Sequence, residues 1–138
     1  MIKEIKKNGV IHAVIIRADF CKQNSIEFCT PDDFSQQLAY MNRPKGYLIQ
    51  PHVHNRISRE VHYTQEVLFV KRGKVRVDFY DEQREYLENA VLQTGDVILL
   101  ASGGHGFTML EETEMIEVKQ GPYTGEADKT RFNGIDVK

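Results

Sequence analysis

The feature that most constrains the fold of this chain is a hydrophobic pattern with a period of two residues. In the stretch 74–80, Val75, Val77 and Phe79 alternate with Lys, Arg, Asp and Tyr. Successive side chains of a β-strand point to opposite faces, so the pattern predicts a half-buried strand. Further short apolar runs occur at residues 10–16, 67–70, 97–100, 107–110 and 115–118. Together these runs predict an all-β chain.

Turn signals separate the predicted strands at fairly regular distances. They are Pro44-Lys45-Gly46, Lys71-Arg72-Gly73-Lys74, Asp81-Glu82-Gln83, Thr94-Gly95-Asp96, Ser102-Gly103-Gly104 and Glu111-Glu112-Thr113. Short strands punctuated in this way are typical of a β-sandwich or β-barrel. The segment Leu48-Ile49-Gln50 leads into a further predicted strand, which carries His52 and His54.

Composition limits the classes of function. A length of 138 residues fits one domain, and 41% hydrophobic residues suffice for a core. The net charge of -2 argues against a nucleic-acid-binding protein. No apolar run approaches the roughly 20 residues that span a bilayer, and Met1–Lys7 lacks the apolar core of a signal peptide. Cys21 and Cys29 fit no zinc or redox motif, so we expect a cytoplasmic protein, although a disulfide between them stays open.

Four side chains along this pattern have the chemistry of metal ligands. His52 and His54 stand two apart on a predicted strand, so both imidazoles face the same side. Glu66 opens the next predicted strand, and His105 follows a later apolar strand and a glycine turn. Three imidazoles and one carboxylate suit one divalent transition metal, namely Fe, Mn, Ni, Co or Zn. Four ligands leave one or two positions open for water or substrate.

The order of these residues resembles the two motifs of the cupin superfamily. Gly46, five residues, His52-Val53-His54, then Glu66, six residues and Gly73 looks like the first motif. Gly95, five residues and Ala101-Ser102-Gly103-Gly104-His105 is similar to the second. The resemblance implies an all-β double-stranded β-helix, the cupin or jelly-roll barrel, with His52, His54, Glu66 and His105 as ligands inside it.

The resemblance also implies how one domain, residues 1–138, is organised. The barrel core is expected at about residues 36–119, with N-terminal strands at 8–30 and a C-terminal tail at 120–138 packing on it. Cupins usually have three or four residues between the second histidine and the glutamate, whereas eleven separate His54 from Glu66 here. Glu60 is therefore a rival ligand. Residues 97–107 and 117–123 look like a bacterial subgroup of small cupins that is often carbohydrate-related.

The long insert at residues 55–65 starts beside one predicted ligand and ends beside another. It brings Arg56, Arg59, His62 and Tyr63 toward the expected barrel mouth. Arginine forks suit carboxylate or phosphate groups, so Arg56 and Arg59 are candidate substrate-binding residues. His62 and Tyr63 are candidate catalytic residues, since an imidazole titrates near neutral pH. The alternative is a solvated loop whose arginines pair with Glu60 or with a neighbouring subunit.

Several functions fit this pattern. The first is a metal-dependent enzyme, of isomerase or dioxygenase type, acting on a small polar or anionic substrate such as a carbohydrate. The second is a metal-free sugar isomerase or epimerase, with His52 or His54 as base and Tyr63 as acid. The third is a non-catalytic module that binds a small ligand, and the fourth is a structural metal site. Open sheet edges, and the resemblance to cupins, favour a homodimer.

Overall fold

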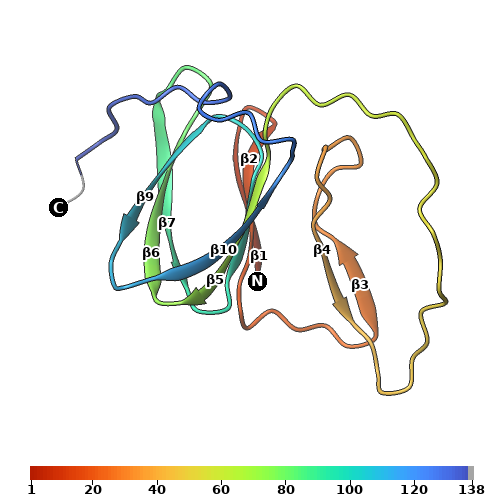
Figure 1. Cartoon of the computed structure of the whole chain (residues 1–138). Helices are drawn as coiled ribbons and strands as arrows, with labels where there is room; N and C mark the ends of the chain where they lie inside the picture. Colours follow the sequence, from red (N-terminus) through yellow and green to blue (C-terminus); the bar gives the residue numbers. More distant parts are fainter. Residues whose placement is uncertain (137–138) are drawn as a thin grey trace.

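The computed structural model describes residues 1–136 and shows an all-β chain, as the period-two pattern predicts (Figure 1). Within that range the structure contains no helix and ten strands. They are β1 (Ile2–Lys7), β2 (Val10–Ile16), β3 (Ser25–Phe28), β4 (Ala39–Asn42), β5 (Glu66–Arg72), β6 (Lys74–Tyr80), β7 (Tyr86–Gln93), β8 (Val97–Leu100), β9 (Gly104–Met109) and β10 (Glu114–Lys119). Accordingly, residues 1–136 include no helix that is long and apolar enough to cross a membrane.

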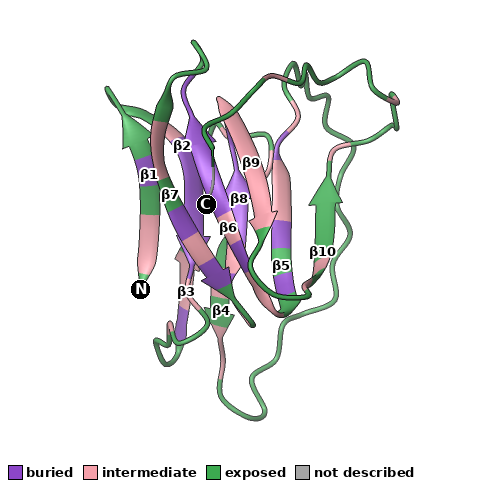
Figure 2. Ribbon diagram, turned by 90° about the vertical axis from the view of Figure 1, so that its left-hand side faces the viewer, coloured by how far each residue is buried: buried purple, intermediate pink, exposed green. Residues whose placement is uncertain are grey.

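The strands form two facing antiparallel sheets and a separate hairpin. One sheet has the order β1-β2-β8-β5-β10, and the other has the order β7-β6-β9 (Figure 2). The hairpin β3–β4 lies outside the five-stranded sheet (Figure 1). This arrangement is consistent with a β-sandwich. Within residues 1–136 the two sheets do not close into the barrel that the resemblance to cupins implies.

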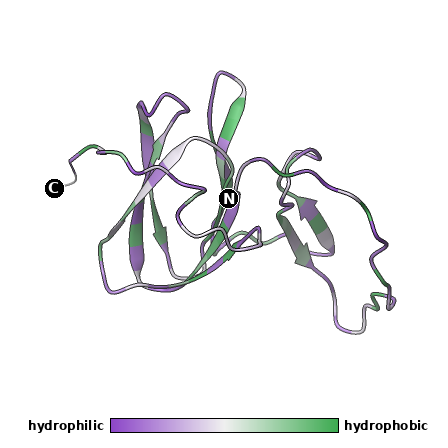
Figure 3. Cartoon of the chain, turned by 45° about the horizontal axis from the view of Figure 1, so that its top comes forward, coloured by the Kyte–Doolittle hydropathy of each residue, from purple (hydrophilic) through white to green (hydrophobic). Residues whose placement is uncertain are grey.

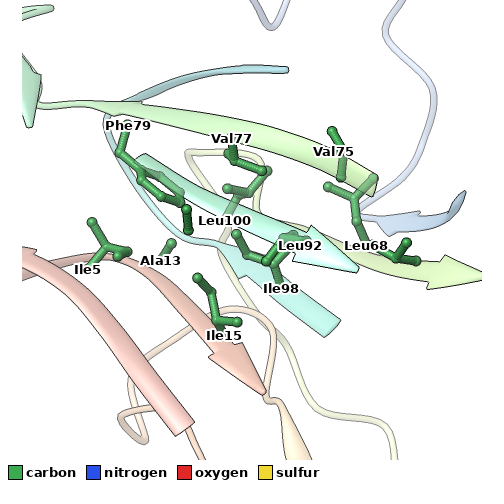
Figure 4. Close-up of a cluster of buried hydrophobic side chains, with 12 residues drawn as sticks. Ile5, Ala13, Ile15, Leu68, Val75, Val77, Phe79, Leu92, Ile98 and Leu100 are labelled. Carbon is green, nitrogen blue, oxygen red and sulfur yellow. The ribbon is translucent and has the colours of Figure 1, made fainter. Parts of the chain in front are cut away.

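The core lies between the two sheets and follows from the alternation in the sequence. Val75, Val77 and Phe79 of β6 point inward and are at most 1% exposed. They pack against residues of the facing sheet (Figure 4), namely Ile5, Ala13, Ile15, Leu68, Val70, Ile98 and Leu100. The central strand β8 is buried on both faces, as its continuous apolar run predicts. The similar run in β5 is covered on one face only, because Phe69 on the other face stays 39% exposed.

Two motif glycines stand where the chain passes close to another segment. Gly73 is the only residue between β5 and β6, and its φ of +104° lies in the left-handed region. A Cβ at this position would collide with the backbone oxygen of Glu112. Gly103 has a φ of +71°, and a Cβ there would collide with the backbone oxygen of Tyr80. Side chains at either position would push apart the turns that bring β5 and β9 to the site.

The chain between β4 and β5 corrects one strand prediction. Residues 43–65, here called the arm, contain no strand, although the pattern around His52 and His54 predicts one. The arm runs as an extended loop outside the five-stranded sheet (Figure 1), and residues 44–63 are all exposed. Its backbone has no neighbouring strand in the described part of the chain, and an alternating sequence becomes a strand only when it pairs.

Both ends of the chain contact the sandwich, whereas β3, within the expected N-terminal range 8–30, belongs to the separate hairpin. β2 lies between β1 and β8 in the five-stranded sheet, so the N-terminal strands are an integral part of the sandwich. In the tail, the Ile135 backbone N–H donates to Tyr80 Oη over 3.0 Å, and Phe132 packs edge-on against the Tyr80 ring. Residues 137–138 of the predicted tail lie outside the described residues. Cys21 and Cys29 are free thiols rather than a disulfide.

Candidate functional site

Two of the four predicted metal ligands, Glu66 and His105, lie side by side. Glu66 begins β5 in the five-stranded sheet, and His105 is the second residue of β9 in the three-stranded sheet. Glu66 Oε1 lies 3.5 Å from His105 Nε2, and their side chains are 20% and 27% exposed. Two residues 39 positions apart in the sequence thus meet at one end of the space between the sheets.

Strand parity explains why both side chains point between the sheets. Glu66 has the parity of Leu68 and Val70, which are buried in the core. His105 has the parity of Phe107, which also packs against the core. The polar pair therefore continues the inward-facing rows of β5 and β9 at the point where the apolar core ends.

Charged neighbours set the ionisation of this pair. The hydrogen bond with His105 lowers the pKa of Glu66 to about 2, and it outweighs the opposing effect of burial. The pKa of Glu117 is raised, first by its hydrogen bond with Glu66 and then by burial. Lys119 lies opposite Glu66 in the β5–β10 register, and its Nζ is 3.8 Å from Glu117 Oε1. Glu66 is thus held as a carboxylate, the form in which it binds a cation.

The other two predicted ligands lie elsewhere in this chain. His52 and His54 are exposed residues of the arm, with ring centroids 5.3 Å apart. His52 Nδ1 is hydrogen-bonded to the Gln50 backbone oxygen over 2.9 Å. Among residues 1–136, no three His, Cys, Asp or Glu side chains come together as a group that would hold a metal ion. A single copy of the chain therefore assembles one half of the predicted ligand set.

The two candidate catalytic residues lie at the base of the arm. His62 and Tyr63 line a cavity of about 300 Å³, together with Lys119 and the tail segment 120–125. The Thr64 hydroxyl donates to Asp128 Oδ2 over 3.0 Å and holds the arm against this tail. Lys119 of this cavity also neighbours the Glu66 carboxylate and lowers its pKa.

The candidate substrate-binding residues, Arg56 and Arg59, are exposed on the arm. Neither makes an ion pair or a side-chain hydrogen bond with another residue in the range 1–136, so both guanidinium groups are available to an anion. The rival ligand Glu60 is 85% exposed and lies 3.6 Å from His62. It is far more exposed than Glu66, and its described partner is His62 rather than His105.

Two charged neighbours of the site were not among the predicted site residues. Glu117 and Lys119 have charged side chains, which usually face solvent, yet they share the inward parity of Met115 at the core. The alternation of residues along β10 is the sequence feature that could have identified them. Gln65 and Gln120, which the sequence pattern did not single out, fix the base of the arm through hydrogen bonds of 3.0 Å and 2.7 Å.

Comparisons with known proteins add no identification. No family model matches the chain, and neither the curated proteins nor the solved structures contain a match to it. The function of this chain is therefore inferred from the residues and geometry of the site.

Proposed function

We propose that this chain is a metal-dependent enzyme of the cupin type that acts on a small polar or anionic substrate, such as a carbohydrate derivative. The observation that carries the proposal is the contact between Glu66 and His105. The sequence pattern selects these two residues independently, from separate motifs and separate strands. Their meeting at a half-buried, charged end of the sandwich supports a common binding role.

The donor chemistry fits a divalent transition metal. Imidazole nitrogens and a carboxylate are suitable ligands for Fe, Mn, Ni, Co and Zn, and Glu66 is already ionised. We propose Glu66 rather than Glu60 as the carboxylate ligand, because Glu66 contacts His105 whereas Glu60 is in solvent. His52 and His54 complete the proposed set, and they must reach the pair from the arm. A metal bound there supplies Lewis-acid polarisation of a substrate oxygen or an activated water.

The remaining side chains are assigned to the substrate. Arg56 and Arg59 bind its anionic group through guanidinium forks. His62 and Tyr63 line the neighbouring cavity and move a proton to or from the substrate. Lys119 faces the same cavity and contributes positive charge near the carboxylates.

A second candidate is metal-free acid–base catalysis in sugar isomerisation or epimerisation. One specific observation favours it: Glu66 Oε1 lies 3.5 Å from His105 Nε2, and a carboxylate beside an imidazole can hold it in a defined orientation. In that case the same cavity binds the sugar and the Glu66–His105 pair transfers the proton.

Elemental analysis of protein purified without a metal-chelating tag tests the proposal. We expect about one metal equivalent per chain in the wild type, as for a single four-ligand site. Glu66→Gln and His105→Ala should lose the metal, whereas the matched control Glu60→Gln should keep it. Proton–deuterium exchange into sugar phosphates and nucleotide sugars then reports on catalysis. A wild type that stays metal-free after reconstitution contradicts the metal proposal. If this metal-free protein still catalyses proton–deuterium exchange into a sugar, the result supports the metal-free candidate.

A further inference from the structure

The sandwich has two open strand edges on the same side of the molecule. β10 pairs with β5 alone, and β9 pairs with β6 alone. Figure 2 shows both strands toward the same side of the sandwich, away from β1 and β7. Within residues 1–136, no strand lies along the outer edge of either. Such edges present backbone donors and acceptors that readily pair with another segment.

Apolar side chains are exposed at these edges. Ile116 and Val118 of β10 are 53% and 58% exposed, and Met109 at the end of β9 is 50% exposed. Phe69 of the neighbouring β5 shares the outward face of Ile116, its partner in the register. These four residues are apolar surface that a covering segment would remove from water.

The arm has matching properties. It is extended, and its apolar side chains are between 45% and 85% exposed, namely Tyr47, Leu48, Ile49, Val53, Ile57, Val61 and Tyr63. Figure 3 shows hydrophobic stretches along this loop, which stands away from the sandwich. An ordinary surface loop is polar, so a run of exposed apolar residues on an extended segment is typical of a chain that packs against a partner.

Hydrogen bonds at the arm's base hold it on the outside of its own five-stranded sheet. Gln65 Oε1 accepts from the Gln36 backbone N–H over 3.0 Å, and the Gln65 N–H donates to Gln120 Oε1 over 2.7 Å. Gln120 Nε2 in turn donates to Ser35 Oγ over 2.7 Å. Glu66 points the opposite way, into the space between the sheets. For the arm to reach its own site, it would have to turn back from this network, because Gln65 and Glu66 face opposite sides of the sheet.

We infer that two copies of this chain exchange arms, so that the arm of each lies along the open edges of β9 and β10 of the other. In this two-fold dimer, His52 and His54 of the partner subunit approach Glu66 and His105, and both sites are completed at once. The metal-binding part of the inference rests on the proposed function, whereas the exchange itself rests on the edges and the arm. A second copy is the occupant that the observations favour, because the arm carries the two donors that each site lacks.

The geometry of the chain permits the exchange. Twelve residue steps from His54 to Glu66 span at most about 40 Å when extended, which is enough to reach a neighbouring subunit. An exchange of identical segments forms a closed, isologous dimer, because each subunit donates and accepts the same surface. The arm also brings Arg56 and Arg59 over the partner's site, so these anion-binding residues and the Glu66–His105 pair of one site come from different subunits.

Complementation between two defective chains tests the exchange. His52→Ala/His54→Ala chains lack the arm ligands, and His105→Ala chains lack a core ligand. We co-express them with two different affinity tags, purify the heterodimer through both tags, reconstitute with Co²⁺ and measure the metal. Arm exchange predicts about one Co²⁺ per heterodimer, since one of its two sites has all four ligands, and almost none in either variant homodimer. In the matched control, an Asn55→Ala chain replaces the His52→Ala/His54→Ala chain. This heterodimer should also bind Co²⁺, because Asn55 is not a ligand.

Cross-linking tests the exchange without any metal. In a Cys21→Ser/Cys29→Ser background, chains with Val53→Cys are co-expressed with chains carrying Val118→Cys, a position opposite Val67 and next to Glu66 in the β5–β10 register, and treated with a short bis-maleimide. Arm exchange predicts a covalent heterodimer, together with a dimeric mass for the untreated wild type by light scattering. A monomeric wild type overturns the inference. So does a Val53→Cys/Val118→Cys double variant that cross-links only within one chain, at monomer mass.

The two experiments separate the inference from the proposed function. A wild type that binds no Co²⁺ but forms the covalent heterodimer refutes the metal proposal and supports arm exchange. A wild type with about one Co²⁺ per chain, combined with an empty complementation heterodimer, supports the metal site and shows that each arm closes on its own subunit. That result overturns the inference.

Discussion

Truncating Ile98 tests whether the sandwich core is packed as described. Ile98 is 0% exposed at the centre of β8, where it pairs with Ile15 of β2 and Leu68 of β5. The change Ile98→Val removes one methylene, and Ile98→Ala removes three carbon atoms. At about 0.8 kcal/mol per buried methylene, the transfer cost is about 0.8 and about 2.4 kcal/mol. The cavity adds to both values, so we expect losses of about 1 and about 3–4 kcal/mol in the free energy of unfolding.

Urea unfolding followed by circular dichroism measures these losses. Because the stability of a dimer depends on its concentration, all variants are compared at one chain concentration and with metal removed. Val10→Ala is the control, since Val10 is 47% exposed and its truncation should cost less than about 0.5 kcal/mol. Equal losses for Ile98→Ala and Val10→Ala, with unchanged slopes of the transition, would refute the description of β8 as the buried centre.

Two further predictions concern buried carboxylates. Asp96 accepts hydrogen bonds from the backbone N–H groups of Ala18 and Gln93, each 2.8 Å long. In Asp96→Asn, the new amide nitrogen cannot accept a hydrogen bond. We therefore expect urea unfolding to show a loss of about 1–3 kcal/mol in the free energy of unfolding. The Lys7 ammonium, which donates to Asp81 over 2.7 Å, is the main cause of the lowered pKa of Asp81. The contribution of the ionised Asp81 carboxylate to stability is therefore complete above its unfolded pKa of 3.8. This contribution is lost as the pH falls through the lower pKa that Asp81 has in the folded state. Urea midpoints should fall less steeply with acidification in Asp81→Asn than in the wild type, and parallel pH profiles would contradict the assignment.

The sequence predicted the sandwich strands well where the pattern was local. Alternating residues in β6 and the apolar run in β8 identify these strands. A strand buried on one face has alternating apolar residues, and a strand buried on both faces has a continuous apolar run. β1 was not predicted, because four charged residues mask the single fully buried Ile5. The same kind of pattern wrongly predicts a strand around His52 and His54 in the arm. The pattern fits a strand, but the sequence does not specify a strand with which this segment would pair.

For the site, the sequence by itself determined which residue types are available and in what order. The spacing singled out Glu66 and His105, and strand parity turned both inward. Only the tertiary structure decided that this pair meets while His52 and His54 remain on an exposed arm. The physical reason is that a contact across two sheets depends on how the strands are ordered and where their edges stay open. A pattern of period two carries no information about either.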